Sequence, residues 1–446
     1  MGSDSSLTYG ALLNKAWPII LANAAIPLLG LVDTAVIGHY GSTAELAGLA
    51  VASVVFNLIF WLLGFLRMGT TGFIAQADGA QNQNRMMQIL LQSLLFALLL
   101  SVLLLCFQSP LLALSHWLLQ PPSSVAPHLD AYFYIRIWGA PVALINFVAL
   151  GYFIGRAQSK TILVLQLFLN ISNALFDYIF AGILDWGLEG IAFGTLLAQL
   201  LCALISLVLI SKQLPLLSYL IQNPLAKIMH GCMALLVQNR ELFIRTLFLL
   251  MGFTFFTRIA GSFGELNLAA NHILLQFIAF SAFFLDGFAH VLEAQVGRFL
   301  GAKDQHRLRL VSLRSSVLAG GCALLLALSF YYLGAYVAQL LTNKQDVVDL
   351  VVYFLPYCAL YTFLAVAAFQ LDGLYIGVSY GAAMRNCSMV STLIFLFSWY
   401  FFFIEWGNTG LWLAFIVFVV IRGASLAFYL PALKRYVQLQ EKPRHV

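Results

Sequence analysis

The sequence has little charge: Asp, Glu, Lys and Arg together make up only 9% of its 446 residues. A soluble globular domain has about 25% charged residues, so a soluble fold is excluded. Hydrophobic residues make up 62% of the chain, and apolar segments of roughly 20 residues recur along it, each long enough to cross the ~30 Å hydrocarbon core of a bilayer. The sequence therefore predicts an all-α polytopic membrane protein.

The sequence also lacks the patterns of common catalytic and metal sites. Its six cysteines are scattered, with no CxxC pair and no histidines at metal-ligand spacing, which is typical of small apolar residues in helices. No P-loop and no nucleophile elbow occurs. The net charge of +5 is divided among short loops and does not indicate a nucleic-acid surface. We expect no enzyme activity, cofactor, metal or nucleic-acid partner, and a monomer in the lipid bilayer.

The positive residues are distributed asymmetrically among the connections between apolar segments. If the N-terminus is cytoplasmic, 18 Lys and Arg residues, including Lys442 and Arg444, lie at cytoplasmic ends and loops, and Lys344 alone lies in an outer loop. Because Lys and Arg are retained on the cytoplasmic side, both termini are predicted to be cytoplasmic. The twelve predicted spans are 12–38, 46–76, 87–110, 130–156, 161–184, 188–211, 240–262, 267–296, 311–341, 348–377, 386–405 and 410–433.

The two halves of the sequence match each other at an offset of 220 to 223 residues. Each half holds an even number of spans, so both halves enter and leave the membrane on the same side, as parallel repeats do. Two six-helix bundles around a central cavity are typical of a transporter, whereas a receptor or scaffold has no need of the duplication. The predicted bundles are 1–213 and 240–446, joined by a cytoplasmic linker, 214–239. The matched positions are Thr34 and Thr257, Gly38 and Gly261, Gly41 and Gly264, Gly79-Ala80 and Gly301-Ala302, Gly151 and Gly373, Ile154 and Ile376, Gly155 and Gly377, Trp186-Gly187 and Trp406-Gly407, and Gly190 and Gly410.

Two acidic residues lie inside predicted spans of the first half. Asp33 is the only charged residue between Pro18 and Gly38, and Asp177 lies in the fifth span. Both spans run outward, so the two carboxyl groups are expected at a similar depth, where they cannot both ionise easily in a poorly solvated site. We interpret them as a proton carrier. The alternative is a hydrogen-bonded acid pair that only holds the helices together.

Other residues of the first half extend this hypothesis. Asn173 lies four residues before Asp177 and therefore on the same helix face, and Asn170 continues the polar stripe. Pro18 and Pro27 lie in the first span, where a proline removes a backbone hydrogen bond and favours a kink that acts as a gate. The alternative is that membrane helices simply tolerate these prolines.

The second half has no acids at the matching positions. The register places Phe256 opposite Asp33 and Trp399 opposite Asp177, so coupling chemistry is expected in the first half. Other acidic residues lie near the ends of spans, where either an ion pair at the solvated mouth of the protein or a second cation site would explain them. Arginines near span ends are expected to snorkel or to pair with a neighbouring acid. The residues concerned are Asp286, His290 and Glu293 on one face of the eighth span, Asp372 in the tenth, and Arg136, whose suggested partner is Asp130.

The motif Val32-Asp33-Thr34-Ala35-Val36-Ile37-Gly38-His39, followed by Leu46-Ala47-Gly48, resembles the MATE multidrug and toxin extrusion family, and its DinF branch in particular. The resemblance implies a V-shaped, two-lobed fold in which a cation gradient drives drug export. In the proton-coupled members an acid on the first helix and another on the fifth form the coupling site, and Asp33 and Asp177 match them. Further matches are Asn173, Thr195, Asn146 and the first-helix proline, Pro18.

The chain departs from the sodium-coupled NorM branch of that family. Beyond Arg245 the seventh span contains no acid to match the one that the branch carries there, and its only charged residue is Arg258. Asp372, however, resembles the branch's acid in the tenth span. We therefore expect a proton-coupled antiporter that exports hydrophobic, often cationic, compounds across a bacterial inner membrane. The alternatives are a sodium-coupled exporter of the same family and a lipid-precursor flippase of related two-lobe fold, which would need a cationic cleft.

These expectations assign a role to each candidate residue. Proton coupling is assigned to Asp33, Asp177, Asn173 and Thr195, and gating to Pro18 and Pro27. Substrate contacts are assigned to Asn146, Asn170 and Tyr178. Asp286, Glu293 and Asp372 are secondary acidic candidates, and small organic molecules are the expected substrates.

Overall fold

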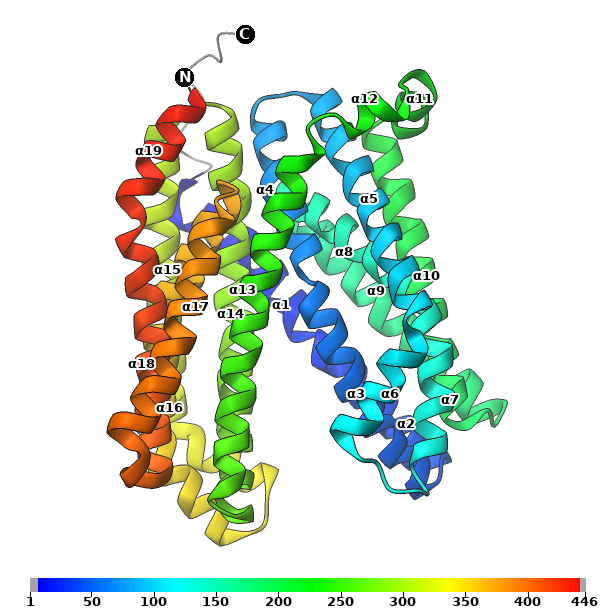
Figure 1. The fold of residues 1–446 in the computed structure, drawn as a ribbon, viewed down its shortest axis with the longest axis vertical. Coiled ribbons are helices and arrows are strands. Elements are labelled where there is room, and N and C mark those ends of the chain that lie inside the picture. Colours follow the sequence, from blue (N-terminus) through cyan, green and yellow to red (C-terminus); the bar gives the residue numbers. More distant parts are fainter. Residues whose placement is uncertain (1–6, 442–446) are drawn as a thin grey trace. The chain divides into compact units, whose positions relative to one another are not determined.

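The computed structural model describes residues 7–441, which form a set of long α-helices (Figure 1). Eleven segments among these residues are long and apolar enough to cross a membrane. The last of them, Gly381–Gln438, contains two long helices, α17 (Gly381–Ser398) and α18 (Gly407–Phe428). The predicted all-helical, polytopic fold is confirmed. Lys442 and Arg444, which contribute to the charge asymmetry, lie outside the described residues.

The helices group into two compact units. The first unit is Leu21–Leu236, and the second unit is Met1–Ile20 together with Val237–Val446. The beginning of α1 (Tyr9–Ala24) thus groups with the second unit, whereas the sequence-based boundary placed all of 1–213 in the first bundle. The packing explains this grouping, because Ile20 lies directly against Gly287, where the absent side chain leaves room for it. The carbonyl of Leu7 also accepts a hydrogen bond of 2.9 Å from Nη1 of Arg314.

The long helices of both units correspond to the predicted apolar spans, several of which are interrupted. The first unit contains α2 (Ile26–Tyr40), α3 (Thr43–Leu63), α4 (Phe65–Gly79), α5 (Gln83–Cys106), α6 (Gln108–Leu119), α7 (Ala126–Arg136), α8 (Ala140–Gly155), α9 (Ser159–Asp177) and α10 (Gly187–Gln213), with the short helices α11 (Leu216–Gln222) and α12 (Leu225–Met229). The chain then continues through α13 (Cys232–Ser262), α14 (Glu265–Gly301), α15 (Gln305–Leu341), α16 (Gln345–Gly377), α17, α18 and α19 (Leu430–Glu441).

The first span is interrupted at Ala25, between α1 and α2. Pro27 is near the start of α2, where it has no backbone N–H to donate. Nδ2 of Asn170 on α9 donates a hydrogen bond of 2.6 Å to the carbonyl of Ala25. Pro18 lies inside α1, which continues past it. Of the two prolines assigned to gating, Pro27 is therefore the one beside the interruption, and Asn170 stabilises a carbonyl there.

The backbone repeats itself at the offset found in the sequence. One turn of π-helix, a rare conformation, follows α9 at Tyr178–Ile183 and recurs after α17 at Trp399–Phe403. Residues with positive φ recur in the turns that follow matched helices. These pairs are Gln81 and Lys303, Ala157 and Ser379, and Gly187 and Gly407.

Glycines allow a close helix crossing in each unit. Gly151 of α8 lies against α4, and a Cβ on it would be only 2.6 Å from the carbonyl oxygen of Arg67. Gly373 of α16 lies against α14 in the same way, with 2.7 Å to the carbonyl oxygen of Ala289. The glycine four residues further along each helix repeats the contact. Small residues at this spacing let the two backbones approach, as in other membrane helix pairs.

Part of the predicted linker is attached to the first unit. Nε2 of Gln92 on α5 donates to the carbonyl of Ile228 at 2.7 Å, and Nε2 of Gln88 donates to the carbonyl of His230 at 2.8 Å. These carbonyls lie at the end of α12, and the two amides satisfy them where the helix stops. The segment 225–230 therefore packs on α5.

Candidate functional site

Asp33 and Asp177 come together inside the first unit. Asp33 lies on α2 and Asp177 is the last residue of α9, and their exposed fractions are 5% and 0%. The two carboxyl groups face each other, and each influences the charge of the other. Among the described residues, no donor forms a well-aligned hydrogen bond with either oxygen of Asp177. Because two carboxylates have only acceptor oxygens, they bind each other only when one of them carries a proton.

Asn173 and Thr195 lie beside this carboxyl pair. Asn173, fully buried one helical turn before Asp177, donates from Nδ2 to Oγ1 of Thr195 at 3.1 Å. Thr195 in turn donates to the carbonyl of Ile191 at 2.9 Å. The neighbouring Gly194 of α10 is necessary for this arrangement, since a Cβ there would collide with Oδ1 of Asp177. The missing side chain of one glycine thus makes room for the carboxyl group.

Arg136 is a third buried charge near the pair. It is the last residue of α7, where a short 3-10 stretch, Ile137–Gly139, separates α7 from α8, and only 6% of it is exposed. Its Nη1 donates to Oε1 of Gln199 at 3.1 Å. Its guanidinium carbon lies 5.6 Å and 5.2 Å from the ring centres of Phe56 and Phe60, within the range of cation–π attraction.

The suggested pairing of Arg136 with Asp130 is wrong. Oδ1 of Asp130 instead lies 2.6 Å from Nε2 of His116 on α6. Arg136 points to the interior, where its charge interacts with Asp33. Sequence position placed the arginine near a span end, but the break between α7 and α8 turns its side chain inward instead of toward solvent.

The three residues assigned to substrate contacts lie in different surroundings. Asn146 donates from Nδ2 to the backbone carbonyl of Gln199 at 3.0 Å and has a buried Oδ1 that accepts no bond from the described residues. Asn170 is engaged with the carbonyl at the interruption of the first span. Tyr178 is 48% exposed and packs edge-to-face on Tyr40 at 6.2 Å. Only Asn146 shares a partner with Arg136.

In the second unit, Asp372 on α16 is held between two guanidinium groups. Arg245 of α13 and Arg422 of α18 both form ion pairs with its Oδ2. All three side chains are buried. An acid that two arginines neutralise is a poor ligand for a free cation, because the cation would have to displace a guanidinium.

The other acidic candidates lie on α14 of the same unit. Asp286 is half-buried, and its charge interacts with Arg245. Glu293 and His290 are buried further along the helix. No group of three His, Cys, Asp or Glu residues with metal-binding geometry occurs within residues 7–441. Of the three, Asp286 has a charge that acts on the Asp372 cluster.

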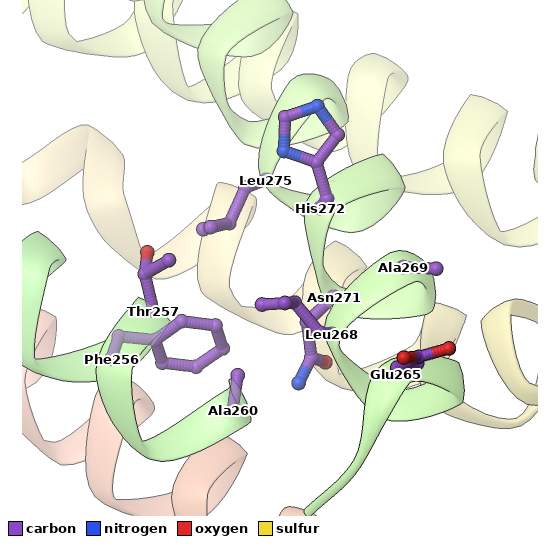
Figure 2. A pocket seen from close by; sticks show the side chains of 9 residues that line it. All are labelled: Phe256, Thr257, Ala260, Glu265, Leu268, Ala269, Asn271, His272 and Leu275. Atoms are coloured by element: carbon purple, nitrogen blue, oxygen red, sulfur yellow. The ribbon is translucent and has the colours of Figure 1, made fainter. Parts of the chain in front are cut away.

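A cavity of about 480 Å³ opens in the second unit between the end of α13 and the start of α14. Figure 2 shows Phe256 and Thr257 on one side, opposite Leu268 and Leu275. Mostly apolar walls with a few polar groups suit an organic ligand. The one carboxylate in its wall is Glu265, so the cavity contains no acid pair like that of the first unit.

Sequence reasoning missed Gly194, Gln199 and the inward direction of Arg136. A signal for Gly194 was available: it lies four residues after Gly190, and the matching residue of the second half is Ala414. A glycine in the half that has the acids, and an alanine in the other, indicates a position where space is needed. Nothing local in the sequence indicates Gln199.

One family model and several known proteins match this chain. The MatE family model matches residues 18–179 and 242–401. The DNA damage-inducible protein F of Escherichia coli is 33% identical over 418 residues, which is 94% of this chain and 91% of that protein. The human multidrug and toxin extrusion protein 1 is 26% identical over 78% of this chain and 60% of that protein.

Solved structures match the fold over nearly the whole chain. A MOP superfamily transporter from Pyrococcus furiosus has a TM-score of 0.85 at 17% identity, covering 96% of both chains. The Vibrio cholerae MATE transporter VcmN in its bent form has a TM-score of 0.85 at 21% identity, covering 98% of this chain and 99% of that one. At these identities the likeness concerns the fold.

Proposed function

The chain belongs to the MatE family, and from that premise we propose that it is a proton-coupled antiporter that exports hydrophobic, often cationic, organic compounds across a bacterial inner membrane. The observation that carries the proposal is the fully buried Asp177, whose carboxyl group lies against that of Asp33 with no well-aligned donor among the described residues. A proton shared between the two acids satisfies both.

The proposed cycle exchanges this proton for a cation. With both termini in the cytoplasm, the pair releases its proton inward and an organic cation binds in response to the charge left behind. A proton arriving from outside then displaces the cation. The helix that moves is α2, which begins beside Pro27 and which Asn170 holds through the carbonyl of Ala25. Protonation of Asp33 changes the balance of forces on that helix directly.

The second unit offers no observation in favour of sodium coupling. Asp372, the residue that resembles the acid of the sodium-coupled branch, is paired with Arg245 and Arg422. A sodium ion would have to compete with both guanidinium groups for this carboxylate. This supports assigning the coupling to the proton.

The proposal is tested by transport into liposomes with the two ion gradients imposed separately. Purified protein is reconstituted with a pH-sensitive dye inside, and ethidium serves as the probe cation. A pH gradient alone should drive ethidium movement, and adding ethidium should dissipate the pH gradient. A sodium gradient at uniform pH should drive none. Transport that follows sodium and ignores the pH gradient would overturn the proposal.

A further inference from the structure

We propose that Arg136 is the fixed counter-charge of the Asp33–Asp177 pair, which keeps one of the two carboxyl groups ionised so that the site exchanges a single proton. The inference rests on the proposed function, since it concerns the charge balance of the same site. It assigns to Arg136 a positioning role that neither the sequence pattern nor the family match indicates.

The burial of Arg136 is the first step. A guanidinium is always charged, and a buried charge in a membrane span is unfavourable unless an opposite charge lies near it. No acidic side chain within the described residues forms a direct ion pair with Arg136, and its polar neighbours Gln199 and Tyr132 are neutral. Its charge interacts with that of Asp33, whose partner is Asp177. The carboxyl pair is therefore the available source of negative charge.

The second step is that Arg136 is held in place and cannot simply turn away. The rings of Phe56 and Phe60 on α3 lie within 5.6 Å of its guanidinium carbon, and Gln199 on α10 accepts a hydrogen bond from it. Gly139 lies at the break after α7, where a Cβ would be 2.8 Å from Nη1 of the arginine. The fold has thus left space for the guanidinium on one side and provided aromatic faces on the other.

The third step is the charge balance of the site. The titratable groups that face one another are Asp33 from α2, Asp177 from α9, and Tyr132 and Arg136 from α7, while α3 and α10 contribute the neutral side chains Phe56, Phe60, Thr195 and Gln199. With both acids ionised the site has one excess negative charge, and with one proton it is neutral. Because an uncompensated net charge is costly at low dielectric, the neutral form is favoured. One proton or one monovalent cation restores neutrality, and the second acid stays ionised opposite Arg136.

The test compares R136Q, R136K and the unaltered protein in the same liposome assay, with exchange measured as a function of pH. Removing the positive charge makes both acids bind protons more tightly, so the pH midpoint of ethidium-driven proton release should move upward by about 1 pH unit or more in R136Q. R136K keeps the charge and should lie close to the unaltered protein. R258Q is the matched control, since Arg258 is exposed near the end of α13 in the second unit.

A charge-compensated double variant gives the sharper result. In D33N the remaining Asp177 and Arg136 neutralise each other, so no exchangeable proton is left and coupling should be lost. Adding R136Q to D33N leaves Asp177 alone, which again takes up and releases one proton, and exchange should rise about tenfold above that of D33N alone. A residue that only packs against its neighbours would not produce this rescue.

The outcomes separate the inference from the proposed function. If the unaltered protein shows no proton-coupled exchange, the proposed function fails. If it does and R136Q has an unchanged pH midpoint, or D33N is not rescued by R136Q, only the role of Arg136 fails. Should R136Q prove too unstable to reconstitute, G139A carries the test, because it displaces the guanidinium without removing it. A G139A midpoint identical to that of the unaltered protein would also overturn the inference.

Discussion

The two units share one backbone repeat but place their buried charges at different positions of it. The charged site of the first unit contains two acids and an arginine, and all three matching positions of the second unit lie inside its hydrophobic core, where aromatic side chains pack on one another. These matches are Asp33 with Phe256, Asp177 with Trp399, and Arg136 with Cys358.

The buried charges of the second unit likewise have no charged counterparts in the first. The second unit buries Asp372 between two arginines, and at the matching positions the first unit has only uncharged side chains. These matches are Arg245 with Ala22, Asp372 with Leu150, and Arg422 with Cys202. Neither charged cluster is therefore required to build a six-helix unit of this kind. The first leaves a carboxyl pair dependent on a proton, whereas the second neutralises its acid with protein groups.

The largest expected effect comes from removing the acids of the first unit. D33N and D177N should each reduce proton-coupled ethidium exchange to background, because the amide can neither release a proton nor leave a negative charge for the cation. The measurement is the dye-based liposome assay. D185N is the matched control: Asp185 is exposed in a loop and has φ of 55°, a conformation that Asn adopts readily. Normal coupling in D33N would contradict the assignment of proton coupling to the acid pair of the first unit.

The same substitution should affect stability oppositely in the two units. D372N removes the carboxylate that forms ion pairs with both Arg245 and Arg422 and should destabilise the protein by about 3 kcal/mol or more. D177N replaces a carboxyl group that has no ion pair and should leave the thermal unfolding midpoint in detergent unchanged or raised. A large loss of stability in D177N would show that the acid pair has a mainly structural role.

Because the glycine contact is repeated, the same substitution should reduce the stability of the protein equally in either unit. G151A and G373A each place a methyl group against a backbone carbonyl, at 2.6 Å and 2.7 Å, so each should destabilise by about 2 kcal/mol. G320A is the control, because a Cβ there meets open space in the middle of α15. Thermal unfolding of the three variants provides the comparison. A loss confined to one unit would indicate that the two crossings are not equivalent.

The smallest expected effect comes from making the first unit resemble the second at one position. G194A introduces the residue that stands at position 414 and pushes the carboxyl group of Asp177 away from α10. Coupled exchange should fall by about tenfold, since misplacing a reacting group by a fraction of an ångström lowers rates on that scale. Protein yield and unfolding temperature should change little. Full activity in G194A would contradict the proposed packing of the site.

Much of the fold was predictable because a membrane restricts which segments of a chain can cross it. Each span needs a long apolar run, so the spans could be located to within a few residues, and the interruptions that divide them, such as the break at Ala25, followed only partly from Pro27. The repeat was visible because glycines such as Gly151 and Gly373 are needed for close backbone contact in both units.

The sequence alone determined that Asp33 and Asp177 are buried acids of one unit, because both lie inside apolar spans of the first half and are removed from water however those spans pack. Tertiary structure decided which charges meet. The break after α7 turns Arg136 away from Asp130, and Asp372 finds arginines that lie 127 and 50 residues away in the chain. Burial depends on local composition, whereas pairing depends on which helix faces pack together, and no single helix contains that information.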